Sequence, residues 1–253
     1  MTTVTIDRPP VNAMSRAVVA QLESALGALA NEPATHVAVL RGAGERGFTA
    51  GADIAEFPAL LEPAADTRGE GIQRLADRIE AFPKPIIVAI HGFCMGGGLE
   101  IALACDIRVA AEDARLGLPE VRIGILPGGG GTQRLPRFVG PGRARFMIYS
   151  GEPISGRLAL EWGLVDRAVE PAELFDKVHA LARSLAAQSP HSLAVIKALM
   201  RETANTPLAD GLRAETAAFA RLLAHPDARE GISAFLGKRE ARWAAPPAGR
   251  PDA

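Results

Sequence analysis

Apolar positions in the first 110 residues follow two periodicities. Short apolar runs at 4–6, 36–40, 86–90 and 107–110 have the length of β-strands. Apolar residues at helical spacing predict helices over 15–30 and 72–82, and prolines end both patterns. Because strands that alternate with helices need crossover connections, the sequence predicts an α/β core with largely parallel strand pairing.

The pattern changes after Gly131. One short strand candidate remains at 165–169, and the rest is helical: a turn at 132–138, then 142–150, 156–162, 172–187, 191–203, 208–224 and 227–237. We therefore expect an α/β core over 1–190 and a helical C-terminal region over 191–243. Residues 244–253 are rich in Pro and Ala and have little to pack, so we expect a disordered tail there.

Composition excludes several classes of partner. A length of 253 residues fits one domain, or one domain with an appendage, and a net charge of −1 provides no field for nucleic acid or an anionic membrane. Cys94 and Cys105 form no C-x-x-C motif, and the five histidines have no metal-like spacing. No signal peptide and no membrane-length apolar run is visible, so we expect a cytoplasmic protein without a metal site.

Two glutamates stand out as candidates for acid/base chemistry. Gly96, Gly97 and Gly98 open an apolar segment that carries Glu100, and Glu120 follows twenty residues later. A glycine-rich strand-to-helix turn leaves backbone N–H groups uncovered, and burial of an acid raises its pKa toward the working range of a catalyst. Either acid alone has a structural explanation, Glu100 as a first-turn acid of a helix and Glu120 as a solvated turn residue. Together they indicate machinery that could form and discharge an enolate.

Three glycine-containing motifs offer alternatives. Residues 42–47 match G-x-G-x-x-G but continue into a Gly/Ala loop instead of a helix, which disfavours a dinucleotide site. Residues 92–96 match a nucleophile elbow with Cys94 as nucleophile, which keeps an α/β hydrolase open, although a free cysteine is most often a small buried apolar residue. Residues 128–131 lack the Lys-Ser/Thr ending of a phosphate loop, so a flexible turn is favoured there.

Five segments together resemble the enoyl-CoA hydratase/isomerase (crotonase) family. They are 48–54, 84–85, 96–100, 118–120 and 124–135, and they keep the family's order and register over nearly the whole chain. The resemblance implies an α/β crotonase-like spiral of ββα units with a helical C-terminal region that serves trimer formation. A homotrimer, or a homohexamer built from two trimers, is the implied assembly.

The resemblance also implies roles for individual residues. The backbone N–H groups of Ala50 and Gly97 match the oxyanion hole that holds the thioester carbonyl oxygen. Glu100 matches the glutamate that activates water, and Glu120 matches the one that exchanges a proton at the α-carbon. Many relatives keep only one of these acids, so retention of both points to hydration of a 2-enoyl-CoA to the 3-hydroxyacyl-CoA. No metal or redox cofactor is implied, because CoA arrives as part of the substrate.

The expected contacts to CoA come from two places in the chain. Ala52, Asp53 and Ile54 resemble the adenine-side contact region, and Ala55 stands where many relatives have Lys. Lys238 resembles a basic residue that reaches the CoA phosphates from a neighbouring subunit, although a solvated helix-end Lys would look the same. Relatives usually have another short segment before the first strand, so we expect an upstream start or a shortened first strand.

Other functions stay open at this level. Within the family, isomerase, lyase or hydrolase activity on another acyl-CoA is the main rival to hydration. A non-enzymatic relative that binds acyl-CoA or nucleic acid is a further possibility, disfavoured by the near-neutral charge and the glutamate pair. The expected setting is β-oxidation or related acyl breakdown, with the length and branching of the acyl group undetermined.

Overall fold

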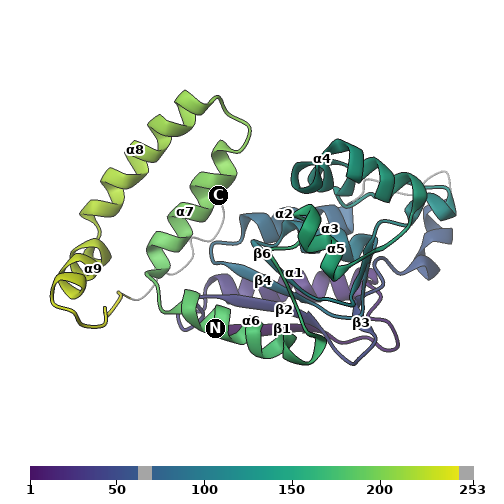
Figure 1. The fold of residues 1–253 in the computed structure, drawn as a ribbon, viewed down its shortest axis with the longest axis horizontal. Coiled ribbons are helices and arrows are strands. Elements are labelled where there is room, and N and C mark those ends of the chain that lie inside the picture. Colours follow the sequence, from purple (N-terminus) through teal and green to yellow (C-terminus); the bar gives the residue numbers. More distant parts are fainter. Residues whose placement is uncertain (62–69, 245–253) are drawn as a thin grey trace.

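Two β-sheets form the centre of the protein (Figure 1). The computed structural model describes residues 1–61 and 70–244. The larger sheet is parallel, with the strand order β1 (Thr2–Ile6), β2 (Ala38–Gly42), β4 (Ile86–Ile90), β6 (Ile107–Ala111) and β9 (Arg167–Val169). The smaller sheet has the order β3 (Gly47–Thr49), β5 (Phe93–Met95), β7 (Arg115–Gly117) and β8 (Ile154–Ser155), and only its β7–β8 pair is antiparallel.

Consecutive strands are shared between the two sheets. In each of the pairs β2–β3, β4–β5 and β6–β7, the first strand joins the larger sheet and the second joins the smaller one. These pairs lead into α2 (Glu70–Ala81), α3 (Gly97–Ala104) and α4 (Gly131–Ser150), with short 3₁₀ helices η1 (Ile54–Leu60) and η2 (Glu120–Ile123) on the way. The repeated unit is therefore ββα, and the predicted spiral of such units is confirmed.

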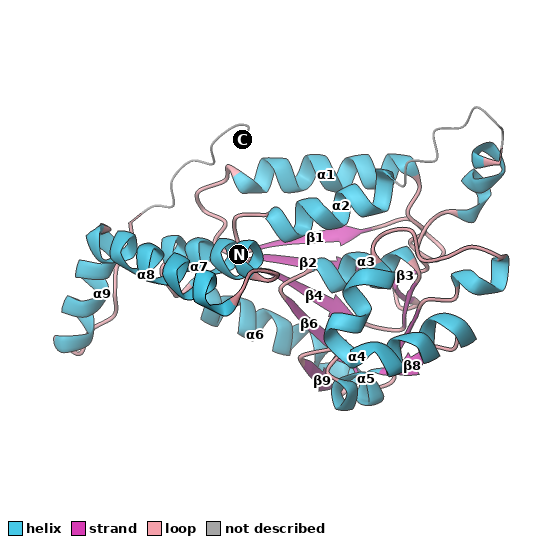
Figure 2. Ribbon diagram, turned by 90° about the horizontal axis from the view of Figure 1, so that it is seen from above, coloured by secondary structure: helices cyan, strands magenta, loops and turns pink. Residues whose placement is uncertain are grey.

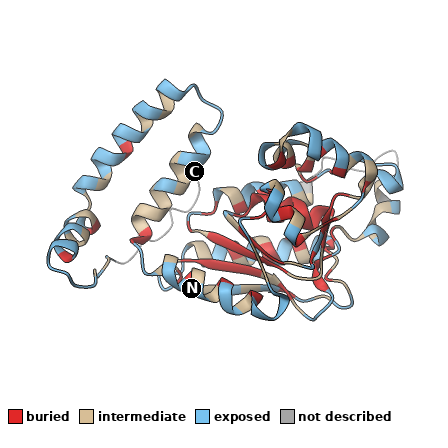
Figure 3. Cartoon of the chain, viewed as in Figure 1, coloured by how far each residue is buried: buried red, intermediate tan, exposed pale blue. Residues whose placement is uncertain are grey.

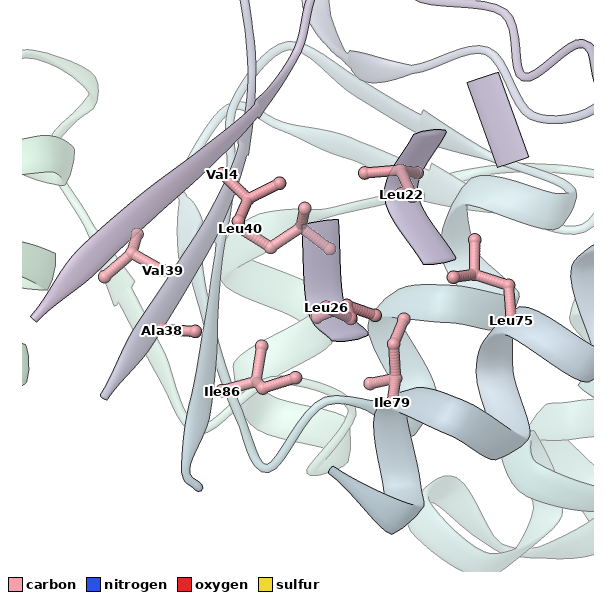
Figure 4. A pocket seen from close by; sticks show the side chains of 9 residues that line it. All are labelled: Val4, Leu22, Leu26, Ala38, Val39, Leu40, Leu75, Ile79 and Ile86. Carbon is pink, nitrogen blue, oxygen red and sulfur yellow. The ribbon is translucent and has the colours of Figure 1, made fainter. Parts of the chain in front are cut away.

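Helices cover the larger sheet on both faces. α1 (Arg16–Ala30) and α2 lie on one side of it, and α6 (Leu174–Ala186) lies on the other (Figure 2). Every residue of β4 is buried, as expected of a central parallel strand that is covered on both faces. A cavity of about 10 Å³ between this sheet and the helices is lined only by apolar side chains, among them Leu26 and Ile79 (Figure 4). It offers about the room of one water molecule and no polar partner, so it is a packing gap and not a substrate site.

The remaining helices fall into two groups. α5 (Gly156–Trp162) and the 3₁₀ helix η3 (Pro171–Glu173) flank β9, whereas α7 (Pro190–Thr203), α8 (Leu208–Ala224) and α9 (Pro226–Leu236) project from the core (Figure 1). Within the described ranges no helix has the length and apolarity needed to cross a bilayer.

Several predicted boundaries change in the structure. The strand expected at 36–40 lies at 38–42, and the stretch 42–56, expected to be a loop, contains β3 and the start of η1. The helical turn at 132–138 and the helix at 142–150 are two halves of α4, separated by a kink at Gly140, where φ is +77°. The expected tail at 244–253 lies, apart from Ala244, outside the described residues.

Candidate active site

Glu100 lies in the first turn of α3, in the middle of the core. All eight residues of this helix are buried, and Glu100 itself is 2% exposed. The sequence forms a helix here because glycines at its start let the chain turn sharply out of β5: Gly96 has a φ of +53°, in the left-handed region that favours glycine. Glu100 is thus a first-turn acid, as its structural explanation supposed, but its burial means that it is not held there by solvent.

A glycine loop clamps the Glu100 carboxylate. The N–H groups of Gly129 and Gly131 both donate to Oε1 at 2.7 Å. Burial raises the pKa of Glu100, while these two hydrogen bonds and the positive charge of Arg134 oppose the rise by favouring the ionised form. The loop at 128–131, expected to be a flexible turn, is instead the support of a catalytic candidate.

Arg134 also holds the loop at residues 128–131. Its guanidinium donates to the carbonyl oxygen of Gly129 at 3.0 Å, and to Glu80 and Asp77 of α2 at 2.8 Å each. These bonds tie the loop to α2, which itself packs on α3. The loop that holds Glu100 is therefore itself held in place by Arg134 of α4 and by the two acids of α2.

Glu120 lies at the start of η2, against the same turn. A Cβ atom added to Gly96 would stand 2.9 Å from Oε1 of Glu120, so this carboxylate touches the entry to α3. Its other oxygen, Oε2, is buried and has no hydrogen-bond partner among the described residues. Burial raises the pKa of Glu120 to about 7, and the negative charge of Glu100 adds to the rise. The two carboxylates thus share one site but differ in the hydrogen bonds that they accept.

Unpaired backbone N–H groups lie beside these acids. Gly97 is the first residue of α3, and its N–H has no hydrogen-bond partner within the described ranges, as is usual at a helix start. The segment 50–52 passes directly next to it: a Cβ atom on Gly51 would stand 3.0 Å from the nitrogen of Gly97. The two segments expected to form the oxyanion hole therefore meet.

On this second segment, the N–H group that is free differs from the one expected from the sequence. The N–H of Ala50 already donates to the carbonyl oxygen of Val11 at 3.0 Å, so Ala50 is not free to bind a ligand. The neighbouring amides of Gly51 and Asp53 are also used, by Thr49 Oγ1 and by the carbonyl oxygen of Met14. Among the four N–H groups from Ala50 to Asp53, only that of Ala52 has no partner in the described structure. Ala52 therefore replaces Ala50 as the candidate donor on this segment.

Comparisons with known proteins decide the family. A family model described as enoyl-CoA hydratase/isomerase matches residues 1–246. The chain belongs to this family. A probable enoyl-CoA hydratase of Bacillus subtilis is 46% identical over 242 residues, covering 95% of this chain and 93% of the relative. A crotonyl-CoA hydratase of Syntrophomonas wolfei is 38% identical over 239 residues, covering 94% and 92%. The crystal structure of an enoyl-CoA hydratase from Bacillus anthracis has a TM-score of 0.91 at 37% identity, covering 96% of each chain.

The residues expected to contact CoA are divided between two parts of this hydratase/isomerase-family chain. Asp53 bonds to Arg8 at 2.6 Å, which lowers the pKa of its carboxyl group, and Ile54 is 50% exposed at the start of η1. Both adjoin Ala52 at the edge of the site. Lys238 does not: it follows α9, which lies at the opposite end of the molecule from β3 (Figure 1). A single chain therefore does not bring Lys238 to the site.

Some lining residues were missed by sequence reasoning. The side chain of Ile72 lies against Gly97 and against Gly129 of the loop that holds Glu100. A Cβ atom added to either glycine would overlap it, at 2.3 and 2.6 Å. The side chain of Met14 also lies near Gly97, with its Cε atom 3.3 Å from the position of an added Cβ atom. In the sequence, Ile72 is only one apolar position of an amphipathic helix, so no signal separated it from the core.

The other candidate chemistries gain no support. Cys94 lies in β5 with 0% exposure, and burial raises the pKa of its thiol, so it is neither accessible nor ionised as a nucleophile must be. Residues 43–46 connect β2 to β3 and do not open a helix. Across residues 1–61 and 70–244, no three His, Cys, Asp or Glu side chains come together as metal ligands.

Proposed function

We propose that the protein is an enoyl-CoA hydratase, which adds water in the syn sense to a 2-enoyl-CoA and gives the 3-hydroxyacyl-CoA. The observation that carries this proposal is the pairing of the buried Glu100 with the half-buried Glu120, beside the N–H groups of Ala52 and Gly97, which have no partner among the described residues. Relatives named as hydratases over nearly the whole chain support the same reaction.

The two N–H groups would hold the thioester carbonyl oxygen. As water adds to C3, the π electrons of the C2=C3 bond move toward that oxygen, and the resulting enolate carries negative charge there. Donors that are fixed before the reaction stabilise this charge without further reorganisation, and loss of one typically costs about 3 kcal/mol of transition-state stabilisation. Gly97 adds the positive end of the α3 dipole to its N–H.

The different hydrogen bonding of the two carboxylates supports a division of roles between them. Two N–H donors favour the ionised form of Glu100, which suits a base that takes one proton from water as its oxygen bonds to C3. Glu120 has no such donor at Oε2 and a pKa of about 7, so it can carry the proton that is delivered to C2. Return of the proton from Glu100 to solvent and reprotonation of Glu120 complete the cycle. This division agrees with the roles that the family resemblance implied.

Related reactions remain the second candidate. An isomerase or lyase of this family would use the same oxyanion site with one acid, and nothing in the structure favours that over the pair. The acyl group is not defined by the residues at the site, so we propose only the 2-enoyl-CoA class. CoA enters as part of the substrate, and we propose no metal or redox cofactor.

Assembly and setting are also proposals. The three C-terminal helices carry exposed apolar side chains, and a homotrimer, or a homohexamer of two trimers, would cover them. We propose a cytoplasmic enzyme of β-oxidation or related acyl breakdown, without nucleic-acid or membrane partners.

Loss of absorbance of crotonyl-CoA at its conjugated-enone band, followed from pH 5 to 9, tests the proposal. We expect the wild-type protein to hydrate crotonyl-CoA, and we expect kcat of hydration to fall as the pH rises above about 7, where Glu120 loses its proton. Glu120→Gln should lower kcat by ~10²- to 10⁴-fold and remove this limb of the profile.

Cys94→Ala is the matched control, since it removes the nucleophile that a hydrolase would need. It should hydrate crotonyl-CoA at close to the wild-type rate. Full activity of Glu120→Gln, or loss of activity in a folded Cys94→Ala protein, would refute the mechanism. A wild-type protein that converts 3-enoyl-CoA but does not bleach crotonyl-CoA would be an isomerase.

A further inference from the structure

The segment that carries the Ala52 donor is fastened along its length to residues 11–14. The N–H of Ala50 donates to the carbonyl oxygen of Val11, and the N–H of Asp53 donates to that of Met14 at 3.1 Å. In the opposite direction, the N–H of Met14 donates to the carbonyl oxygen of Gly51 at 2.8 Å. The two ends of this segment are thus held independently of the substrate.

The bond to Gly51 also sets the direction of the Ala52 N–H. The carbonyl of Gly51 and the N–H of Ala52 belong to one planar trans peptide, so they point in opposite directions. A hydrogen bond that fixes the carbonyl on Met14 therefore aims the N–H of Ala52 away from Met14. How firmly it is aimed depends on Gly51, which has a φ of +93° and could otherwise move.

Thr49 restrains Gly51. Its hydroxyl donates to the carbonyl oxygen of Asn12 at 2.6 Å and accepts from the N–H of Gly51 at 3.0 Å. The side chain is fully buried, and its Cγ2 methyl group packs on Gly98, where an added Cβ atom would stand only 2.5 Å away. Thr49 thus contacts both segments of the proposed oxyanion hole, with its hydroxyl on one and its methyl group on the other.

Asn12 provides a rigid acceptor for that hydroxyl. It is 4% exposed and has a φ of +53°, a conformation that Asn tolerates better than most residues. Its Nδ2 donates to the carbonyl oxygens of Ala43, Gly47 and Phe48, at 2.9, 3.1 and 3.2 Å. One buried side chain therefore joins residues 11–14 to β3 and to the loop that precedes it.

We propose that Thr49 is a positioning residue for the oxyanion hole: its hydroxyl, anchored on the Asn12 carbonyl, holds Gly51 so that the N–H of Ala52 converges with that of Gly97. The inference rests on the proposed function. Thr49 does not touch the substrate in this arrangement, and its effect is exerted through the Gly51–Ala52 peptide. A buried threonine in a three-residue strand would otherwise be explained by packing alone.

Two matched pairs of variants separate the hydroxyl from the packing. Thr49→Val keeps both branches of the side chain and removes only the hydroxyl, as compared with the wild type. Thr49→Ala and Thr49→Ser both lack the methyl group and differ from each other only in the hydroxyl. If Thr49→Val does not fold, the Ala/Ser pair tests the same difference in a smaller side chain.

The expected kinetic result is a fall of at least ~10-fold in kcat with crotonyl-CoA for Thr49→Val relative to the wild type, and for Thr49→Ala relative to Thr49→Ser. Because the oxyanion forms only in the transition state, kcat and kcat/KM should fall together, with little change in KM. Circular dichroism at the assay temperature confirms that each compared variant is folded.

A spectroscopic measurement reads the donor directly. Butyryl-CoA with a ¹³C-labelled thioester carbonyl has no double bond to hydrate, and its bound carbonyl stretch should shift to lower frequency when two N–H groups polarise it. We expect this shift in the wild type and in Thr49→Ser, and a smaller shift in Thr49→Val and Thr49→Ala.

The outcomes distinguish this inference from the proposed function. A folded Thr49→Val protein with wild-type kcat and carbonyl shift, or a Thr49→Ser protein as impaired as Thr49→Ala, would overturn the positioning role alone. Absence of a carbonyl shift in wild-type protein saturated with butyryl-CoA would instead overturn the oxyanion site itself.

Discussion

The α/β core and the C-terminal arm, which comprises residues 190–244, place their apolar residues in opposite ways (Figure 3). In the core, all residues of β4 and α3 are buried. In the arm, α7 buries only Pro190 and α8 only Ala218. The core of a single chain thus already contains the proposed site, whereas the arm presents an apolar surface that a single chain does not cover.

The uncovered surface of the arm is organised. On α8, four exposed apolar residues lie on one helical face: Leu208, Leu212, Phe219 and Leu223. Counted from Leu208, the other three follow after 4, 11 and 15 residues, and each of these spacings is close to a whole number of helical turns. The exposed large apolar side chains of the arm are Ile196, Met200, Leu208, Leu212, Phe219, Leu223, Ile232, Phe235 and Leu236. A stripe of this kind on a monomer marks an interaction surface, and it is the basis of the proposed trimer.

The arm is nevertheless firmly joined to the core at its base. Nζ of Lys197, on α7, donates to Asp106 at 2.7 Å and to the carbonyl oxygen of Lys84 at 3.1 Å, and this side chain is 10% exposed. At the start of α7, Ser189 donates to the buried Asp227 of α9 at 2.5 Å. The core and the arm are therefore connected parts of one structure, and variants can alter each of them separately.

The largest effect is expected from a change confined to the core. In Gly129→Ala the new Cβ atom would stand 2.6 Å from both Oε2 of Glu100 and Cγ2 of Ile72, so the carboxylate must shift and its hydrogen bonds from Gly129 and Gly131 are disturbed. We expect kcat for crotonyl-CoA to fall by ~10²-fold or more, the range typical of a lost general base, while the assembled mass in light scattering stays the same. Neither this glycine nor Gly128 has a positive φ, so backbone strain does not complicate the comparison.

Gly128→Ala is the control for that change. A Cβ atom at Gly128 has no heavy atom within 4 Å, so this variant should keep wild-type activity. Equal activity of the two alanine variants would mean that the clamp on Glu100 is not needed for catalysis.

The next effect is expected from a change confined to the arm. Phe219→Asp places a charge on the apolar stripe of α8, where Phe219 is 61% exposed in the single chain. Burial of a phenylalanine contributes about 1.5–3 kcal/mol per copy, and an unpaired buried charge is costly, so the assembly should dissociate to single chains in light scattering. Ala217→Asp places the same charge on the opposite face of α8 and should leave the assembled mass unchanged. Dissociation of both variants, or of neither, would remove the α8 stripe from the proposed interface.

The fold was predictable where local patterns were long. The helix at 208–224 was predicted with its observed bounds, and the strand at 86–90 likewise, because each shows a sustained periodicity or an apolar run. β3, β5 and β7 have three residues each, too few to show alternation, and their pairing depends on contacts between distant segments. The second sheet therefore came from the family resemblance and not from the pattern of residues.

The site was predictable in its residue types but not in its backbone. Glu100 was identifiable as an acid inside an apolar segment, and Glu120 from its pairing with it. The donor was misplaced, because which N–H is free among residues 50–53 depends on bonds to residues 11–14, nearly forty positions away. The clamp on Glu100 escaped notice for the same reason, since Gly129 and Gly131 carry no side chain that signals a role.

The smallest effect is expected where the arm of one subunit would meet the core of another. Lys238 is exposed and follows α9, which lies at the opposite end of the molecule from β3, so we propose that it contacts CoA phosphates in a neighbouring subunit. We expect Lys238→Gln to raise KM for crotonyl-CoA by about 2- to 5-fold with kcat unchanged, because exposed ion pairs contribute about 0.2–1 kcal/mol. The increase should shrink at high salt, which screens such pairs. Lys177→Gln, at another exposed lysine, should leave KM as it is.

Combination with the arm variant determines which chain supplies the lysine. In dissociated Phe219→Asp protein no neighbour is present, so adding Lys238→Gln should leave KM where Phe219→Asp alone puts it. If Lys238→Gln raises KM equally in both backgrounds, the contact lies within one chain and α9 must be able to reach its own site. If it raises KM in neither, Lys238 is a solvated helix-end residue, and the core binds CoA without help from the arm.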